Sequence, residues 1–360
     1  MTYSAVDQDF EAARAAAPAV RNVRAMRAVR IWLFTVAALV FAMVVVGGAT
    51  RLTGSGLSIT EWKPVTGALP PLTEQAWNVE FDKYKQIPQY ELVNKGMTLG
   101  EFKEIYWWEW SHRQLGRSIG LVFGLGFVAF LLSGALRGRL ALTVAGLGVL
   151  GGLQGAIGWI MVASGLKPGM TAVAPVKLML HLTTASLIFA GLVAVASGLG
   201  RREREATTPG VRRFASAMLA LVLVQIALGG LVAGAKAGLT FNTWPLMDGH
   251  FVPPLSALFL QAPWFENLVD NPMTVQFNHR VVAYAVVALA LAQAWAARRS
   301  QPGSPVCRRA SAIAGLALAQ AGLGVLTLLE MVPLPLGLAH QAFAMLVLGM
   351  SAVHWRLTRA

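Results

Sequence analysis

Four of the six histidines in this chain are the residues best suited to chemistry, because they occupy matching places in two halves of the sequence. They are His112, His181, His279 and His340. In each half, two different apolar segments each offer one histidine. Two imidazoles that face each other across a four-helix bundle can bind one haem iron axially. Zinc requires three or four converging ligands, which neither half supplies, so the pattern favours two haem sites.

The other reading of a single histidine in such a segment is a hydrogen-bonded packing residue, and recurrence in both halves favours ligation. His250 lies in a loop without a counterpart, and we expect His354 to be structural. His354 follows His340 by 14 residues, about 21 Å along a helix, which is the spacing of two haems stacked across a membrane. Fourteen residues after His279 stands Gln293, so no second haem layer can form. The two predicted sites therefore lie side by side.

One acidic residue distinguishes the two halves. Glu109 lies three residues before His112, so both share one face of a continuous helix. Gln276 occupies the matching place before His279. A carboxylate beside one site only suggests that the first half does chemistry and the second carries a cofactor. The alternative is that Glu109 is one of several acids, such as Glu101, in an outer loop.

Four arginines are expected near the same sites. Arginine binds carboxylates in a bidentate manner, and haem propionates are paired carboxylates. Binding of cofactor propionates is one role, and snorkelling towards lipid headgroups is the other. The four residues are Arg51, Arg113, Arg117 and Arg280.

The elements that carry these residues are membrane helices. Hydrophobic residues make up 56% and charged residues 13% of the 360 residues, and the mean hydropathy is +0.57. Soluble proteins carry about 25% charged residues. This composition excludes a soluble enzyme, a disordered chain and a disulfide scaffold. Cys307 is the one cysteine, which excludes an internal disulfide. We expect the arginine-rich residues 1–30 not to form a cleavable signal.

Eight apolar runs predict an all-α polytopic membrane protein with both termini on one side. The runs cover residues 31–50, 115–136, 140–162, 178–199, 213–234, 280–297, 310–330 and 336–355. With a cytoplasmic N-terminus, 18 of the 30 basic residues and 5 of the 17 acidic residues lie inside. That excess equals the whole net charge of +13. The positive-inside rule therefore predicts N-in/C-in topology, and the charge is not a nucleic-acid surface.

The chain also contains an internal repeat. Gly47 matches Gly229 and Trp62 matches Trp244, both at an offset of 182 residues. Each repeat has four spans, and an even number preserves orientation, so we expect parallel repeats. Further matches are Pro70 with Pro253, Gln154 with Gln320, and His181 with His340.

The predicted organisation has four parts. They are a cytoplasmic tail (1–30), an N-terminal four-helix repeat (31–199), a cytoplasmic linker (200–212) and a C-terminal four-helix repeat (213–356). The outer loops 51–111 and 235–278 are long, and long ordered loops usually carry function. Small residues such as Gly148 and Gly152 permit close helix contact, within one chain or between copies of an oligomer.

Several of these segments resemble the haem A synthase family, in the form found in mitochondria and proteobacteria. The likeness covers about residues 30–355. It rests on the glycine-rich run 47–58, the Glu-Trp-Lys-Pro segment 61–64, the aromatic segment 106–113 and the Phe-Asn-His-Arg segment 277–280. The resemblance implies a membrane enzyme that oxidises a methyl group of haem O to a formyl group, making haem A for cytochrome oxidase.

The resemblance also implies roles for residues and partners. His279 and His340 would ligate a resident b-type haem, and His112 and His181 would hold the substrate haem O, with Glu109 as a further catalytic residue. It implies a bacterial inner membrane location with the haem sites towards the periplasm. The implied partners are haem O, haem O synthase, membrane lipid and an unidentified electron-transfer partner, without nucleic acid. Cysteine pairs found in outer loops of some bacterial members are absent from this sequence.

The chemistry requires the methyl group to gain oxygen twice, through an alcohol and a hydrated aldehyde that loses water. Either one axial histidine leaves and the iron activates dioxygen, or water attacks a cationic methylene. In the second route Glu109 could stabilise the cation or accept a proton. A di-haem b cytochrome and a haem chaperone or transporter are the other candidate functions. The difference between Glu109 and Gln276 and the missing second haem layer count against the cytochrome.

Overall fold

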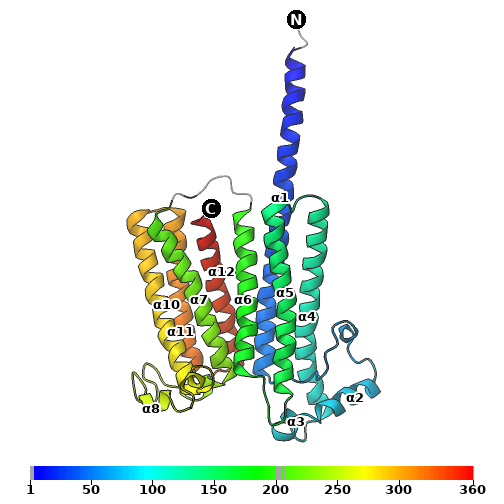
Figure 1. Ribbon diagram of the computed structural model, residues 1–360, viewed down its shortest axis with the longest axis vertical. Coiled ribbons are helices and arrows are strands. Elements are labelled where there is room, and N and C mark those ends of the chain that lie inside the picture. The colour runs from blue at the N-terminus through cyan, green and yellow to red at the C-terminus, as the bar shows by residue number, and fades with distance from the viewer. Residues whose placement is uncertain (1–3, 200–204, 206, 360) are drawn as a thin grey trace.

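The computed structural model describes residues 4–199, 205 and 207–359, with side chains from residue 23 onward. That part of the chain is helical and contains no β-strand (Figure 1). Eight of the helices are long and apolar enough to cross a membrane, which confirms the eight predicted spans. They are α1 (Ser4–Leu52), α4 (Leu99–Leu132), α5 (Gly138–Gly165), α6 (Pro175–Gly198), α7 (Pro209–Gly234), α10 (Pro272–Ser300), α11 (Pro305–Leu329) and α12 (Leu334–Leu357).

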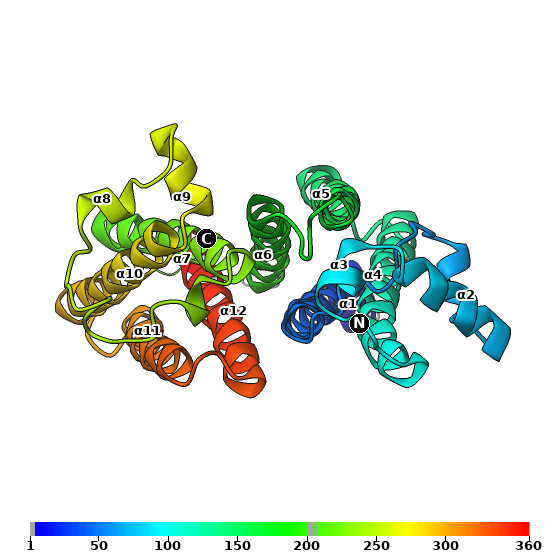
Figure 2. The ribbon, with the colours of Figure 1, turned by 90° about the horizontal axis from the view of Figure 1, so that it is seen from below.

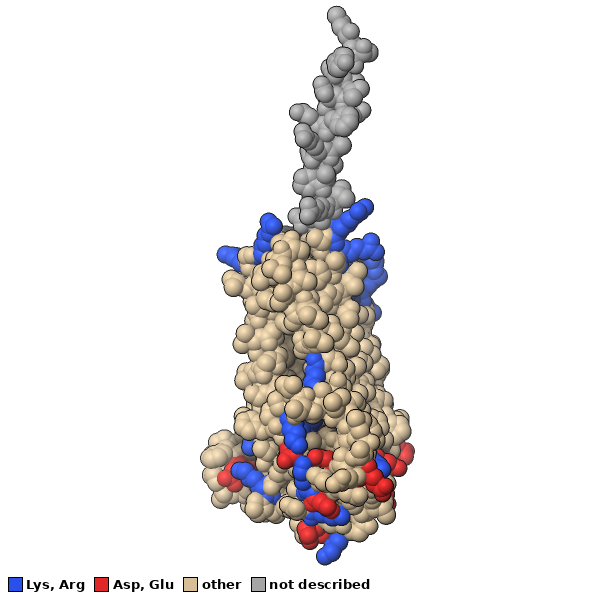
Figure 3. Space-filling view, turned by 90° about the vertical axis from the view of Figure 1, so that its right-hand side faces the viewer, with Lys and Arg blue, Asp and Glu red and all other residues tan. Residues whose placement is uncertain are grey.

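The segments predicted to lie outside the membrane at the inner end are only partly described. The predicted tail forms the beginning of α1 from Ser4 onward. Residues 200–204 and 206 of the predicted linker lie outside the described residues. The two ends of the chain lie at the same end of the molecule (Figure 1). On the face drawn in Figure 3, the lysine and arginine residues at this end have no acidic residue among them that the structure describes, whereas the opposite end carries both acidic and basic residues.

Helix α4 begins far outside its apolar run. The prediction placed residues 51–111 in a loop, but the helix starts at Leu99. Thr98 and Glu101 form a capping box, in which the Thr98 N–H donates to Glu101 Oε2 at 2.7 Å and the Glu101 N–H donates to Thr98 Oγ1 at 3.3 Å. Capping satisfies the first free N–H groups of a helix, so polar sequence can continue it. As a result, Glu109 and His112 lie on one continuous helix.

Both outer loops are folded. The first contains η1 (Thr66–Ala68), α2 (Glu74–Tyr84) and α3 (Pro88–Leu92). The second contains η2 (Ala237–Leu239), α8 (Leu255–Leu258), η3 (Trp264–Glu266) and α9 (Asn267–Asp270). The first loop packs on the outer part of α4 through a buried aromatic cluster that includes Trp77, Phe81, Tyr84, Phe102 and Tyr106. The loops are therefore ordered caps on the helix ends.

The long helices form two groups, seen end-on in Figure 2. The first group is α1, α4, α5 and α6, and the second is α7, α10, α11 and α12. Helices α1, α6, α7 and α12 pack against one another between the groups. Helix α10 packs closely on α11, whereas α4 makes few contacts with α5. The first group is therefore more open on its α4–α5 side.

The backbones of α6 and α7 approach each other at two glycines. A Cβ atom added at Gly230 would lie 2.9 Å from Met179 Cα, and one added at Gly234 would lie 2.6 Å from Pro175 Cα. Glycine at these places permits a separation that any other residue would prevent. This contact joins the two helix groups.

We expect Gly230→Ala to lower the thermal midpoint of the detergent-purified protein, because the added methyl group meets backbone and not a movable side chain. Overpacking of this kind costs about 1–3 kcal/mol. Gly322→Ala in α11 is the matched control, since nothing lies within 4 Å of its added Cβ. The control should melt at or slightly above the wild-type midpoint. Equal midpoints for the two variants would contradict the close α6–α7 contact.

Candidate functional site

The structure brings the four recurrent histidines together in two pairs. His112 of α4 and His181 of α6 lie within the range of electrostatic interaction. His279 of α10 and His340 of α12 do the same. Each pair belongs to one helix group, and the two pairs lie in different groups. Each group therefore holds two imidazoles from two different helices.

Each imidazole lies against a glycine of a neighbouring helix. A Cβ at any of these glycines would press on the ring, so the missing side chain leaves the space that the ring occupies. The pairs, with the distance from an added Cβ to the nearest ring atom, are Gly47 with His112 (3.0 Å), Gly158 with His181 (2.8 Å), Gly229 with His279 (3.2 Å) and Gly324 with His340 (2.8 Å).

Glutamine side chains hold three of these histidines within the described part of the chain. Each amide nitrogen donates to the backbone carbonyl of its histidine: Gln154 to His181 (2.9 Å), Gln225 to His279 (3.0 Å) and Gln320 to His340 (3.0 Å). In the second group the same amides also reach the rings. They lie 3.1 Å from His279 Nδ1 and 3.2 Å from His340 Nδ1. The Nδ1 atom of His181 is buried and has no hydrogen-bond partner among the described residues.

Glu109 is a buried carboxylate whose two oxygens both accept hydrogen bonds. Oε1 accepts from Nε and Nη2 of Arg113, at 3.1 and 2.6 Å. Oε2 accepts from Ser58 Oγ and from the Ile59 N–H, both at 2.8 Å. Four donors fix the orientation of the carboxylate, one turn from His112 on the same helix.

Gln276 makes the corresponding contacts in the second half, with one difference in polarity. Its Oε1 accepts from Arg280 Nη2 at 2.9 Å, and its Nε2 donates to the Ala237 carbonyl at 2.7 Å. The first outer loop presents the Ile59 N–H to Glu109, whereas the second loop presents a carbonyl to Gln276. A carboxylate thus stands where the loop offers a donor, and an amide stands where the loop offers an acceptor.

All four arginines that the sequence singled out donate to backbone carbonyls. The bonds are Arg51 to Ala233 (2.7 Å), Arg113 to Ile59 (2.7 Å) and Glu61 (2.8 Å), Arg117 to Lys63 (2.9 Å) and Pro64 (2.8 Å), and Arg280 to Phe241 (2.9 Å) and Leu246 (3.3 Å). Three of them thus fasten the outer loops to α4 and α10, and Arg51 joins α1 to the end of α7. Nε of Arg280 is buried without a partner among the described residues.

An ion-pair cluster fastens the first loop further. Glu61 accepts from Lys63 at 2.6 Å and from Lys83 of α2 at 2.7 Å. The hydrogen bond from Lys63 has the larger effect, and the two bonds together lower the pKa of Glu61 to about 2. The Glu61 carbonyl receives Arg113, so this cluster links α2 through one loop residue to the arginine that orients Glu109.

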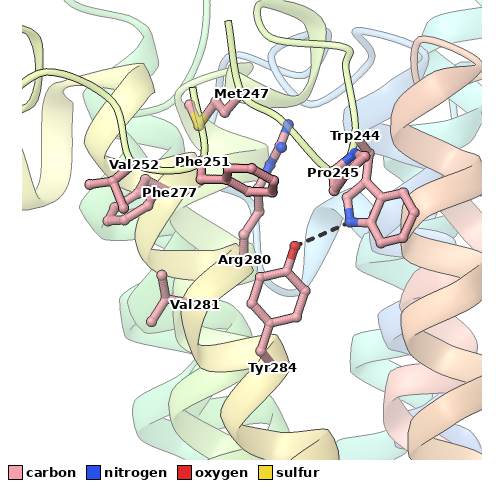
Figure 4. Close-up of a pocket in the computed structure, with 9 residues that line it drawn as sticks. All are labelled: Trp244, Pro245, Met247, Phe251, Val252, Phe277, Arg280, Val281 and Tyr284. Carbon is pink, nitrogen blue, oxygen red and sulfur yellow. Dashed lines mark hydrogen bonds between the residues drawn. The ribbon is translucent and has the colours of Figure 1, made fainter. Parts of the chain in front are cut away.

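Arg280 also lines a pocket of about 440 Å³ on the outer part of α10 (Figure 4). Phe277, Val281 and Tyr284 line it from the same helix, and Trp244 donates to the Tyr284 hydroxyl at 3.1 Å. Residues 277, 281 and 284 follow helical spacing on one face of α10. His279, two residues from 277 and from 281, lies on the other side. The pocket is therefore separate from the space between His279 and His340.

The donor set fits a haem iron better than a bare metal ion. Within the described residues, no group of three or more His, Cys, Asp or Glu could hold a metal ion. Each pair supplies two imidazoles from two different helices, which suits axial ligation. The remaining two histidines are separate from the pairs. His250 is exposed in the second loop, and His354 is buried near the C-terminal end of α12.

Sequence reasoning missed the residues that support the histidines. Gln154 and Gln320 appear in the repeat, but nothing in the sequence assigned them a role. Gln225 gives no repeat signal, because Met43 stands 182 residues before it. Gly47 and Gly229 mark the repeat, and their contacts with imidazoles appear only in three dimensions.

Comparison with known proteins places this chain in a family. The model of the family COX15-CtaA, described as cytochrome oxidase assembly protein, matches residues 30–352. A protein of Methylobacterium sp. (strain 4-46) named heme A synthase is 64% identical over 330 residues, 92% of each chain. Proteins of the same name from Methylobacterium nodulans and Brucella ovis are 63% and 52% identical, over 89% and 94% of each chain. These matches, with eight apolar helices, fit a multi-pass inner membrane protein. The chain belongs to the haem A synthase family of cytochrome oxidase assembly proteins.

Proposed function

We propose that this protein is a haem A synthase, an oxidoreductase that converts a methyl group of haem O into the formyl group of haem A for cytochrome oxidase. The single observation that carries the proposal is the pair of two-histidine sites with a buried carboxylate beside one of them. Its relatives, at 52–64% identity over most of the chain, carry the name of this activity. The two histidine pairs, only one of which has a carboxylate beside it, support two haem sites of unequal chemistry.

His112 and His181 would hold the substrate haem O, and His279 and His340 would hold a resident b-type haem. Three features support this division. Glu109 lies beside the first pair only. The first group is more open between α4 and α5, which suits a site that must admit and release a large substrate. Both histidines of the second pair are held at the backbone by glutamine, whereas only His181 is so held in the first pair, which suits permanent ligation in the second. A resident b-type haem supplies one-electron redox chemistry.

Glu109 acts as a fixed negative charge beside the reacting methyl group. Both of its oxygens already accept hydrogen bonds, so stabilisation of a cationic methylene is favoured over proton acceptance. Preorganised groups of this kind cost no reorientation when charge develops. Arg113 and the first outer loop hold the carboxylate in place.

The two helix groups are parallel repeats, and both termini face the cytoplasm. The repeat is supported by the equivalent glycine contacts of all four histidines. The orientation is supported by the charge distribution, since the described charged residues drawn at the end where the chain begins and ends are basic, whereas the opposite end carries acidic and basic residues together (Figure 3). This orientation puts the outer loops and the haem sites at the periplasmic side of the inner membrane. The electron-transfer partner is a separate, unidentified component.

Incubation of the purified protein with haem O tests the proposed activity. A haem A synthase forms hydroxylated haem and then formyl-haem, which chromatography of extracted haem separates. A di-haem cytochrome or a haem chaperone would return haem O unchanged. Failure to form either product in the presence of a suitable electron acceptor would contradict the proposal.

Replacement of Glu109 by glutamine should lower haem A formation by about 10²–10⁴-fold. The amide can still accept from Arg113, but its NH₂ faces the Ile59 N–H, so one hydrogen bond is lost and the thermal midpoint falls slightly. Haem O or its hydroxylated form should accumulate in membranes, as measured by chromatography of extracted haem.

Gln276→Glu is the matched control for this substitution, and it should affect haem A formation far less. The b-type haem should remain in Glu109→Gln, because its proposed ligands lie in the other half. Wild-type haem A levels in Glu109→Gln would remove the carboxylate from the mechanism. Loss of all bound haem would assign Glu109 a structural role instead.

His279→Ala and His340→Ala should each lose mainly the low-spin b-type haem, because one axial ligand is missing. His112→Ala is the comparison, and it should keep the b-type haem and lose bound haem O. Absorption spectra and extracted-haem analysis of purified variants measure both. A variant that forms haem A without any second haem would disprove the role assigned to the second pair.

Reporter fusions test the orientation. Fusions at Gly303 and at the C-terminus should both report the cytoplasm, because the basic segments lie at that end. A fusion near Gln86, in the first outer loop, should report the periplasm. The reverse pattern would move all four histidines to the cytoplasmic side.

A further inference from the structure

The support of the four histidines differs at one residue of α1. Gly47 and Gly229 occupy equivalent places against the rings of His112 and His279. One turn before Gly229 stands Gln225, whose amide holds His279. The equivalent residue before Gly47 is Met43, at the same offset of 182 residues. The first half therefore has a thioether where the second half has an amide.

Met43 lies next to the histidine that it fails to hold. A Cβ added at Gly116 would lie 2.9 Å from Met43 Cε, so the side chain reaches α4 one turn beyond His112. Neither the ring nor the backbone carbonyl of His112 receives a side-chain hydrogen bond from the residues that the structure describes. A thioether is only a weak acceptor and cannot donate. Position 43 fills space beside His112 without fixing it.

The difference between thioether and amide is not explained by size. Methionine and glutamine side chains have similar lengths, so either could fill the gap between the helices. The amide in the second half leaves Oε1 of Gln225 buried without a partner. Burying such a group costs about 1–3 kcal/mol, which favours a specific task for the amide.

That task is the positioning of a metal ligand. When a second group binds a ligating histidine, it fixes the orientation of the ring, and its loss typically lowers metal affinity by about 10–100-fold. In the second pair, each glutamine amide donates to the backbone carbonyl of its histidine and lies against the ring, so both histidines are held. In the first pair, Gln154 reaches only the backbone of His181, and the His181 Nδ1 atom is unpartnered. The first pair is thus the less firmly oriented one.

We propose that Met43 makes His112 the releasable ligand of the substrate haem, and that Gln225 and Gln320 are positioning residues that retain the resident haem. This inference rests on the proposed function, in which one haem must leave as product and the other stays. How long each haem stays bound thus depends on whether a thioether or an amide lies beside otherwise equivalent histidines.

The test exchanges the two side chains and measures haem release. Protein loaded with haem O and b-type haem is mixed with excess apomyoglobin, and chromatography follows the transfer of each haem. Met43→Gln should slow the transfer of haem O by about 10–100-fold, and Gln225→Met should speed the loss of b-type haem by a similar factor. Met43→Leu, which adds no amide, is the matched control and should release haem O at the wild-type rate.

Electron paramagnetic resonance gives a second readout that packing alone would not move. The low-spin ferric signal of the first-half haem should shift in Met43→Gln and not in Met43→Leu, because the signal depends on the orientation of the axial rings. Equal release rates and equal spectra for the two Met43 variants would overturn the proposal. If Met43→Gln does not fold, Gln225→Met decides the question: a rate of b-type haem loss equal to that of the wild type would overturn the proposal.

These measurements do not depend on methyl oxidation. A protein that forms no haem A but shows the exchanged release rates would contradict the proposed activity and leave the assignment of the positioning residues intact. A protein that forms haem A with release rates insensitive to the exchange would overturn the positioning residues only.

Discussion

An imidazole among apolar helices needs space and a polar partner, and here the neighbouring helices supply space for all four rings and a polar contact for two of them. Burying a polar group without a partner is costly, and the bilayer interior offers no water to replace one. The glycine beside each ring gives the space. Within the described residues, glutamine amides contact two of the four rings, those of His279 and His340. The helices must therefore pack so that these small and polar residues face the histidines.

The outer loops depend on the same helices through their arginines. Arg113 and Arg117 of α4 and Arg280 of α10 donate to loop carbonyls and fasten each loop at the end of its histidine-bearing helix. In the first half this connection includes Glu109, which joins Arg113 to the loop backbone. The carboxylate is therefore part of the loop anchor as well as a candidate for chemistry. Both roles require the same fixed position.

Hydrophobicity and repetition made the eight helices and the recurrent histidines predictable, because bilayer thickness fixes the length of an apolar span. The start of α4 was not predictable in this way. Its first turns are polar, and the signal is the capping pair Thr98 and Glu101. The contacts between glutamine and histidine could not be predicted from the sequence either, because they depend on how each helix is rotated about its axis relative to its neighbour. In the first half, Met43 and not a glutamine occupies the position equivalent to Gln225.

The central claim is that the two histidine pairs hold different haems for different purposes. The most direct measurement is an experimental structure of the protein purified with haem O and b-type haem bound. Haem O is recognised by the long alkyl chain that b-type haem lacks. Density for that chain should lie on the haem between His112 and His181, with Glu109 beside its ring methyl, and b-type haem should lie between His279 and His340. Density for the chain at the second pair, or a single haem shared between the halves, would contradict this account.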